Sequence, residues 1–331
     1  MMYTSVSDSI IVIFVSFALS AICSAFIYRF GNKLSLIDKP GKRSSHSTPT
    51  PRGGGIGIWL SFILIGFFII KNILFSTIVG IAGLVGLLED RFTISSKIRL
   101  TIQLALSFSA VIMFSGVPAS TGQIALFLFW IIFITGTANF YNFMDGINGI
   151  AGLTGLVGFG LMAFFSFFID RQPDTALLSI ALASACLGFM PFNFPNAKVF
   201  MGDVGSIFLG FVFPLFVVKL STTLNVFLCL IMFLCTFYAD ATVTIFYRWR
   251  KGENLMKAHR RHLYQYLSNE LRLPHYQVTV VYAITQLIFG TLALLSLKKG
   301  LTYQLSVFVI FVVIFLISYK VVKNIKPQEI Q

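Results

Sequence analysis

Long apolar runs dominate the sequence, and each is about as long as a helix that crosses a bilayer, roughly 20 residues. About eleven of them follow one another, near 9–30, 55–70, 73–88, 98–116, 124–143, 150–169, 175–193, 204–219, 224–247, 277–297 and 302–322. Charged residues make up only 11% of the 331-residue chain, whereas about a quarter is usual in a water-soluble domain. The sequence therefore predicts an all-α, polytopic integral membrane protein with about eleven transmembrane helices and a single domain over residues 1–331.

The cations are unevenly distributed between the two sides that these spans would define. The chain carries 25 Lys and Arg against 12 Asp and Glu, a net charge of +13, and most of the cations follow the first, third and ninth runs or close the chain. By the positive-inside rule, these loops and the carboxyl terminus are predicted to be cytosolic, and the amino terminus periplasmic. The rule accounts for the basic charge, so the predicted partner is the lipid bilayer and not nucleic acid.

The segment from Gly188 to Gly210, GFMPFNFPNAKVFMGDVGSIFLG, interrupts two apolar blocks with prolines, a lysine and Asp203. Such a broken, polar run is tolerated in a membrane protein only where it faces water or other protein. We interpret it as a loop at the cytosolic edge that aims the Asp203 carboxylate. The alternative is that Asp203 only caps the apolar helix that follows.

Residues 38–57, DKPGKRSSHSTPTPRGGGIG, form a cationic loop that contains three consecutive glycines. Glycine lets backbone N–H groups approach an anion closely, although no Walker-type ending is present. One hypothesis is phosphate contact, with Arg43, Thr50 and Gly54 as candidate contacts and Arg52 as a further cation. An ordinary positive-inside loop is the other.

Two adjacent carboxylates, Glu89 and Asp90, stand in GLLEDR where the third run should leave the membrane. At a helix carboxyl end they oppose the macrodipole, so they are poorly placed for stability alone. This favours a functional role. The alternative is a solvated turn in which Arg91 neutralises the pair.

The fifth run ends in TANFYNFMDGING, with Asn139, Asn142, Asp145 and Asn148 spaced three apart. On a helix this spacing gives one polar ridge, which is costly against lipid and is best explained by a hydrophilic cleft. Interhelical hydrogen bonding is the alternative.

In the ninth run, Asp240, Thr244 and Arg248 recur at four-residue spacing, which again gives one helix face. A structural Asp–Arg relay and substrate contact both remain open for this set.

The loop after the ninth run contains KAHRRHLYQ, in which His259 and His262 lie among three cations, one lysine and two arginines. Zinc binding is disfavoured because neither an HExxH pattern nor a cysteine partner accompanies the pair. Anion recognition suits the charge better, and a basic membrane-surface loop is the alternative.

All these loops are assigned to one membrane face. Carboxylates, amides and a cationic, histidine-bearing loop are what magnesium-assisted phosphoryl transfer requires, because Mg²⁺ takes one or two carboxylates and completes its shell with water and phosphates. A transporter would instead need charges near the midplane and usually an inverted repeat.

Five motifs, DKPGKRSSHSTPTPRGGG, GLLEDR, NFYNFMDGING, NFPNAKVFMGDVGS and AHRRHLYQ, occur in this order over nearly the whole chain. Together they resemble the polyprenyl-phosphate N-acetylhexosamine-1-phosphate transferase family, glycosyltransferase family 4. FMGDxGS is the most specific of the five. AHRRHLYQ is similar to the branch that initiates O-antigen synthesis.

The resemblance implies a reaction at the cytosolic face of the bacterial inner membrane. Undecaprenyl phosphate would attack the sugar-bearing phosphate of a UDP-N-acetylhexosamine or its 6-deoxy derivative, giving undecaprenyl-diphospho-sugar and UMP and starting O-antigen or other cell-envelope polysaccharide synthesis. The expected cofactor is Mg²⁺, with Mn²⁺ as an alternative. The resemblance is also compatible with a homodimer. The rival function is a polytopic transporter or lipid flippase.

The resemblance also implies roles for residues of the motifs. The expected catalytic residues are Glu89, Asp90, Asp203, His259 and His262, with Asp203 and Asp145 as the metal ligands. The expected substrate contacts are Arg43, Thr50, Gly54, Asn139, Asn142, Asp145, Asn193, Phe200, Asp240 and Arg248. Within these sets, the acidic pair would lie near the lipid phosphate and the histidines over the diphosphate and sugar.

The sequence departs from the family pattern at two places. The usual Asp-Asp pair is Glu89-Asp90, which keeps a carboxylate but moves it out by one methylene. The usual DGxDG is DGIN, so Asn148 lacks the charge and no catalytic role is predicted for it.

Overall fold

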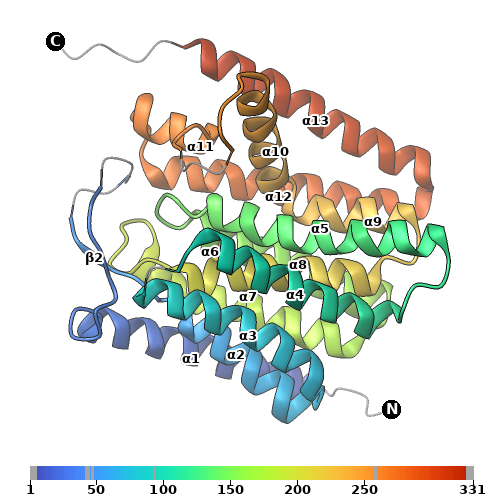
Figure 1. Cartoon of the computed structure of the whole chain (residues 1–331), viewed down its shortest axis with the longest axis horizontal. Coiled ribbons are helices and arrows are strands. Elements are labelled where there is room, and N and C mark those ends of the chain that lie inside the picture. The colour runs from blue at the N-terminus through green and yellow to red at the C-terminus, as the bar shows by residue number, and fades with distance from the viewer. Residues whose placement is uncertain (1–5, 42–44, 46–47, 93, 256–258, 326–331) are drawn as a thin grey trace.

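The computed structural model describes residues 6–41, 45, 48–92, 94–255 and 259–325, and these are mostly helical (Figure 1). Ten helices within these residues are long and apolar enough to cross a membrane. They are α1 (Val6–Phe30), α3 (Ile73–Arg91), α4 (Ser96–Ser115), α5 (Thr121–Phe143), α6 (Ile150–Phe164) with the π-helical turn Phe165–Ile169, α7 (Pro173–Asn193), α8 (Asp203–Leu220), α9 (Leu224–Ile231) joined to α10 (Cys235–Arg250) by the 3₁₀ turn Met232–Leu234, α12 (His275–Ser296) with the 3₁₀ turn Leu297–Lys299, and α13 (Leu301–Asn324). The predicted all-α, polytopic fold is confirmed.

The second predicted run is a shorter apolar helix, α2 (Ile56–Leu64), which continues as a π-helical segment, Ile65–Ile70. It still leads from one end of the bundle to the other. At its start, Gly55 packs against Gly205 near the beginning of α8, and α3 then returns to that same end, where Asp90 bonds the first residue of α8. Helix direction therefore alternates as predicted, and the start of α1 and the end of α13 lie at opposite ends of the bundle (Figure 1).

Helix α8 occupies the core of the bundle. Every residue from Val204 to Val217 is buried, as expected for a helix that is apolar on all sides. Its phenylalanines pack edge to face against neighbouring helices, with ring centroids 5.4 Å apart for Phe208 and Phe62 of α2, and 5.8 Å apart for Phe213 and Phe159 of α6. Contacts on all sides hold α8 in place, so its first residue, Asp203, has a fixed position at the bundle end.

Loops that are distant in the sequence meet at this end of the bundle. Strand β1 (Ile37–Asp38) pairs antiparallel with β2 (Thr50–Pro51). At the last residue of β2, the Pro51 carbonyl accepts a hydrogen bond from the Phe200 amide at 2.8 Å. The Gly149 amide donates to Asn193 Oδ1, also at 2.8 Å. The segments that carry the five motifs therefore form one hydrogen-bonded cluster of loops and helix ends.

Candidate active site

A polar cavity of about 310 Å³ opens at this end of the bundle. Its lining residues are Asp38, Ser45, Arg52, Asp90, Asn142, Asp145, Gly146, Ile147, Asn148, Asn193, Phe200, Gly202, Asp203, Gln265 and His275. Six of the predicted site residues are among them: Asp90, Asn142, Asp145, Asn193, Phe200 and Asp203. The structure thus brings together residues from α3, α5, α7 and α8 and the loops between them.

A second cavity of about 380 Å³ adjoins the first. Ser96, Arg99, Leu100, Asn139, Phe143, Ile245, Arg248, Leu255, His259, His262 and Gln265 line it. Four predicted site residues, Asn139, Arg248, His259 and His262, lie here and not in the first cavity. Because Gln265 lines both, it stands between them.

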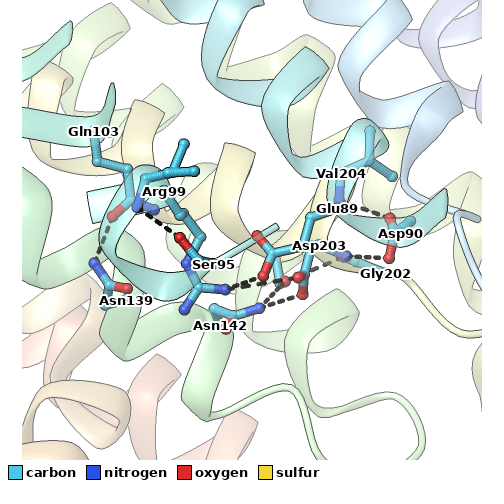
Figure 2. Close-up of polar contacts among 12 residues, drawn as sticks. Glu89, Asp90, Ser95, Arg99, Gln103, Asn139, Asn142, Gly202, Asp203 and Val204 are labelled. Carbon is cyan, nitrogen blue, oxygen red and sulfur yellow. Dashed lines mark hydrogen bonds and ion pairs between the residues drawn. The ribbon is translucent and has the colours of Figure 1, made fainter. Parts of the chain in front are cut away.

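Asp90 caps α8 from the end of α3. Its side chain is 1% exposed, and its two oxygens accept the amide protons of Asp203 and Val204, each at 3.0 Å (Figure 2). The Arg52 guanidinium lies 3.8 Å from the same carboxylate. A buried carboxylate at a helix amino terminus satisfies unpaired N–H groups and favours the dipole. The solvated turn considered for this residue is therefore wrong.

The Asp203 carboxylate, in contrast, does not cap α8 and faces the first cavity. Its Oδ1 accepts a 2.6 Å hydrogen bond from Asn142 Nδ2, which also donates to Ser206 at 3.0 Å (Figure 2). Its Oδ2 lies 3.8 Å from Arg99 Nη1. The alternative in which Asp203 only caps α8 is wrong, because Asp90 occupies that role.

Arg99 of α4 connects Asp203 with Glu89. The same Nη1 atom donates to Glu89 Oε1 at 2.6 Å (Figure 2). The other Glu89 oxygen is buried and has no hydrogen-bond partner within the part of the chain that the structure describes. The Arg99 guanidinium is thus shared between two carboxylates, and the second Glu89 oxygen still lacks a partner. A bound cation could interact with this oxygen.

Asp145 lies in the turn between α5 and α6 and is partly buried in the first cavity. Burial, and then the nearby carboxylates of Asp203 and Asp90, raise the pKa of the Asp145 carboxyl to about 8. Neighbouring carboxylates raise one another's pKa when too little positive charge is present to neutralise them, so a bound cation would lower the pKa of each carboxyl group. No group of three His, Cys, Asp or Glu side chains suited to a metal occurs among the described residues, but Mg²⁺ needs only one or two protein carboxylates.

The polar ridge predicted along the fifth run is wrong as a helical stripe. Helix α5 ends at Phe143, so only Asn139 and Asn142 lie on it, and Asp145 and Asn148 follow in the turn. Asn139 donates to Gln103 Oε1 at 2.7 Å and lines the second cavity. The predicted hydrophilic cleft exists, but Asp145 and Asn148 line it from the turn that follows α5 and not from the helix itself.

Two of the three glycine amides in this loop are already bonded and are not free to contact an anion. The Gly54 amide donates to the Phe200 carbonyl at 2.9 Å and the Gly55 amide to the Met201 carbonyl at 2.8 Å. A Cβ on Gly54 would lie 2.5 Å from Cε2 of Phe189, so glycine is needed here for close packing. This contradicts the expected anion contact of Gly54.

The other residues predicted in this loop have different positions. Thr50 is buried in β2, and its hydroxyl donates to the Thr48 carbonyl at 3.0 Å. Arg43 lies outside the described residues. Arg52 is the cation of this loop that the structure places in the first cavity.

Asp240 lines neither cavity. Its side chain is fully buried, and backbone amides and hydroxyl groups surround its two oxygens. The predicted substrate contact is therefore wrong for this residue. Arg248, on the same helix face, lines the second cavity, lies 3.2 Å from Glu253 and donates to the Asn254 carbonyl at 2.7 Å.

The two histidines of AHRRHLYQ lie side by side at the second cavity, in a segment without helix or strand, with ring centroids 4.9 Å apart. His262 is buried, and its Nδ1 is 3.4 Å from Asp240 Oδ1. Burial, followed by the charges of His262 and two arginines, lowers the pKa of His259 to about 4. His259 is therefore a neutral imidazole at physiological pH and can donate one hydrogen bond.

Replacing His259 by alanine should lower catalytic efficiency for the sugar nucleotide about tenfold to a hundredfold, the worth of one hydrogen bond to a charged acceptor. Because the ring is neutral in the free protein, the deficit should be the same at about pH 6 and about pH 8. The same substitution at Arg272, an exposed residue that lines neither cavity, serves as the control. Equal, small losses at both positions in a donor titration would show that the segment is only a basic surface loop.

Several residues that line the two cavities were not predicted, and three of them are polar side chains placed for a role in the site: Arg99, Gln265 and His275. Arg99 was counted only as a loop cation, although its position one helical turn into α4 brings it to two carboxylates. Gln265 ends AHRRHLYQ, and the motif itself was the available signal. His275 begins α12 and lines the first cavity. It belongs to no motif, so only the packing of α12 beside the Asn148 turn reveals it.

Comparison with known proteins shows which proteins this chain is similar to. Residues 72–221 match glycosyl transferase family 4. The chain is 27% identical, over 92% of its length and 89% of the relative's, to a probable undecaprenyl-phosphate N-acetylglucosaminyl 1-phosphate transferase of Bacillus subtilis.

Two further relatives match more than half of the chain. Identity is 29% to an undecaprenyl-phosphate alpha-N-acetylglucosaminyl 1-phosphate transferase of Thermotoga maritima, over 59% of this chain and 60% of that protein. It is 28% to a decaprenyl-phosphate N-acetylglucosaminephosphotransferase of Mycobacterium leprae, over 54% and 53%. The matched residues 72–221 contain Asp90, Asp145 and Asp203 together with their partners Arg99 and Asn142, so the three carboxylates of the first cavity lie in the part of the chain that is similar to glycosyl transferase family 4.

Proposed function

We propose that this protein transfers an N-acetylhexosamine 1-phosphate from a UDP-sugar to undecaprenyl phosphate and releases UMP. The observation that carries the proposal is the convergence of Asp90, Asp145 and Asp203 with Arg52 and Arg99 at one end of an apolar helix bundle. The polyprenyl phosphate and the N-acetylglucosaminyl 1-phosphate group of the proposal come from the activities named for the relatives. The product would start O-antigen or another cell-envelope polysaccharide.

In the proposed reaction, an oxygen of the lipid phosphate attacks the sugar-bearing phosphorus of the donor. The bond from that phosphorus to the bridging oxygen breaks, and UMP leaves with the electron pair. The acceptor is already an anion, so no proton has to be removed from it. The residues therefore have to hold two anions in line, which supplies much of the catalysis of phosphoryl transfer.

The residues of the two cavities divide this task. Asn142, Asp145 and Phe200 line the first cavity, where they would form the wall on the nucleotide side. Arg99, Arg248 and the two histidines line the second, where they would hold the diphosphate and the sugar. Gln265 stands between the two, where the bond would be exchanged.

Asp203 and Asp145 would hold a Mg²⁺ ion, with Mn²⁺ as an alternative. The raised pKa of Asp145 and the unpaired Glu89 oxygen both indicate that this carboxylate cluster fits a divalent cation. When bound, such an ion neutralises charge on the diphosphate and lowers the barrier to departure of UMP. The side chains themselves would position the donor so that its sugar-bearing phosphate lies in line with the lipid phosphate.

Membranes that contain the protein should release UMP when they receive undecaprenyl phosphate together with one of a panel of UDP-N-acetylhexosamines. A chelator should stop the release and added Mg²⁺ should restore it. The same membranes without undecaprenyl phosphate are the control. A transporter or flippase would move its cargo without producing UMP, so the absence of UMP with every donor of the panel would overturn the proposal.

The active site is proposed to face the cytosol at the bacterial inner membrane, following the positive-inside rule. In a Cys23→Ser background, cysteine introduced at Asn254 should be protected from an impermeant thiol reagent in intact cells. Val117 lies between the end of α4 and the start of α5, whose other ends line the second cavity, and it is 77% exposed, so cysteine at this position should react. Labelling of Asn254→Cys with protection of Val117→Cys would reverse the orientation.

A further inference from the structure

We propose that Asp240 is a positioning residue that holds the histidine segment, His259 to Gln265, at the second cavity. The inference deepens the proposed function and rests on it. It assigns to Asp240 no contact with substrate, because its side chain is fully buried and lines neither cavity.

The Asp240 carboxylate accepts hydrogen bonds from three different elements. Oδ1 accepts from the Leu263 amide at 2.8 Å and from the Thr244 hydroxyl at 3.1 Å. Oδ2 accepts from the Tyr264 amide at 3.1 Å and from the Tyr282 hydroxyl at 2.7 Å. Four donors fill the lone pairs that a carboxylate offers. A buried anion is stable only when it is satisfied in this way.

Two of these donors belong to the histidine segment, and the other two belong to the helix bundle. Thr244 lies one turn further along α10, and Tyr282 lies on α12. Asp240 therefore fixes the backbone at the start of α11 (Leu263–Gln265) relative to two long helices. His262, the residue just before α11, rests against the same carboxylate.

The position of Tyr264 extends this hold to the first cavity. Its hydroxyl donates to the Phe143 carbonyl at the end of α5, at 2.9 Å. A Cβ on Gly146 would lie 2.2 Å from that hydroxyl, so the ring packs directly beneath the turn that carries Asp145. A shift of Tyr264 would therefore move the histidines and the Asp145 turn together. The other end of the segment is held separately, by ion pairs of Glu253 with Arg248 and Arg261.

A positioning role and a purely structural role predict different amide exchange. In Asp240→Asn, one carboxylate oxygen becomes an NH₂ group that faces backbone donors. Hydrogen exchange measured by mass spectrometry should then accelerate in peptides covering 259–266 and remain unchanged in α8. Faster exchange throughout the bundle would show that Asp240 only stabilises the fold.

The kinetic prediction uses non-additivity. Asp240→Asn should lower catalytic efficiency about thirtyfold, but in a His259→Ala background the same change should cost about threefold or less, because the group it positions is already missing. His259 is suited to this cycle because it belongs to the held segment and is not one of the groups that bond the Asp240 carboxylate. Losses that multiply would overturn the inference.

A matched pair of tyrosines provides a milder test if Asp240→Asn does not fold. Tyr282→Phe removes one donor from Asp240, whereas Tyr238→Phe removes a hydroxyl on α10 that contacts Thr137 at 3.0 Å. The first change should lower activity about threefold to tenfold and speed exchange in the segment, and the second should do neither. Equal effects of the two would count against the inference. A wild-type protein that releases no UMP would overturn the proposed function, while the exchange measurements would still test the role of Asp240.

Discussion

Replacing Asp203 by asparagine should lower UMP release by at least about a thousandfold, a loss of about 4 kcal/mol in transition-state stabilisation, and leave the protein folded in the membrane. The carboxylate faces the cavity between Arg99 and Asn142, where its charge serves the reacting groups. Asparagine keeps the size of the side chain but removes the charge and one acceptor. Loss of a preorganised charge at a phosphoryl-transfer site typically has an effect of this order.

The fold should survive because Asp203 does not hold the start of α8. The Asp203 and Val204 amides bond Asp90, and these bonds do not depend on the Asp203 side chain. The control is Asp174→Asn, the same change in the first turn of α7, where an exposed carboxylate lies at the opposite end of the bundle. Thermal unfolding in detergent should be the same for both variants. Normal UMP release by a well-folded Asp203→Asn protein would remove this carboxylate from the mechanism.

The helices could be predicted because a bilayer sets the length of a helix that crosses it. Each apolar run shows this length on its own, without reference to the rest of the chain. Even the second run was found, although its helix, Ile56–Ile70, is shorter than the others. The neighbouring runs determine its direction, because helices that alternate across a bundle must be connected.

Contacts between loops were less predictable, because a local pattern does not name its partner. The periodicity of Asn139, Asn142 and Asp145 assumed a helix that continues, and α5 ends before Asp145. The three glycines indicated that the backbone closely approaches another group, and an anion was the predicted partner. Only the fold shows that they pack against the Val199–Gly205 segment, to which Gly54 and Gly55 bond.

Electrostatic roles were the hardest to assign from sequence. Asp90, Asp203 and Asp240 are all carboxylates on apolar helices, and composition alone does not distinguish them. In the structure the first caps a helix, the second faces a cavity, and the third holds a loop. What separates them is the set of donors that each oxygen meets, and most of those donors are backbone amides from distant segments.

Replacing Asp90 by alanine should lower both stability and activity, and far more than the same change at Glu89. The substitution leaves the Asp203 and Val204 amides unpaired in a buried position, which should cost about 2–6 kcal/mol of unfolding free energy at the usual penalty of about 1–3 kcal/mol for each such group. It also releases the start of α8, so Asp203 loses its fixed position and UMP release should fall by at least about a hundredfold. Glu89 makes one ion pair with Arg99 at a partly exposed site, so Glu89→Ala should be the milder change.

Asparagine at position 90 separates the two effects of the alanine change. Its one carbonyl oxygen can still accept an amide proton from the start of α8, but its NH₂ group cannot accept the second. Asp90→Asn should therefore unfold between wild type and Asp90→Ala in a thermal scan in detergent, and Glu89→Asp, which keeps a carboxylate, should be tolerated. The order expected for both unfolding temperature and UMP release is wild type, then Glu89→Ala, then Asp90→Asn, then Asp90→Ala. Full activity of both alanine variants would mean that this acidic pair neither caps α8 nor serves the lipid phosphate.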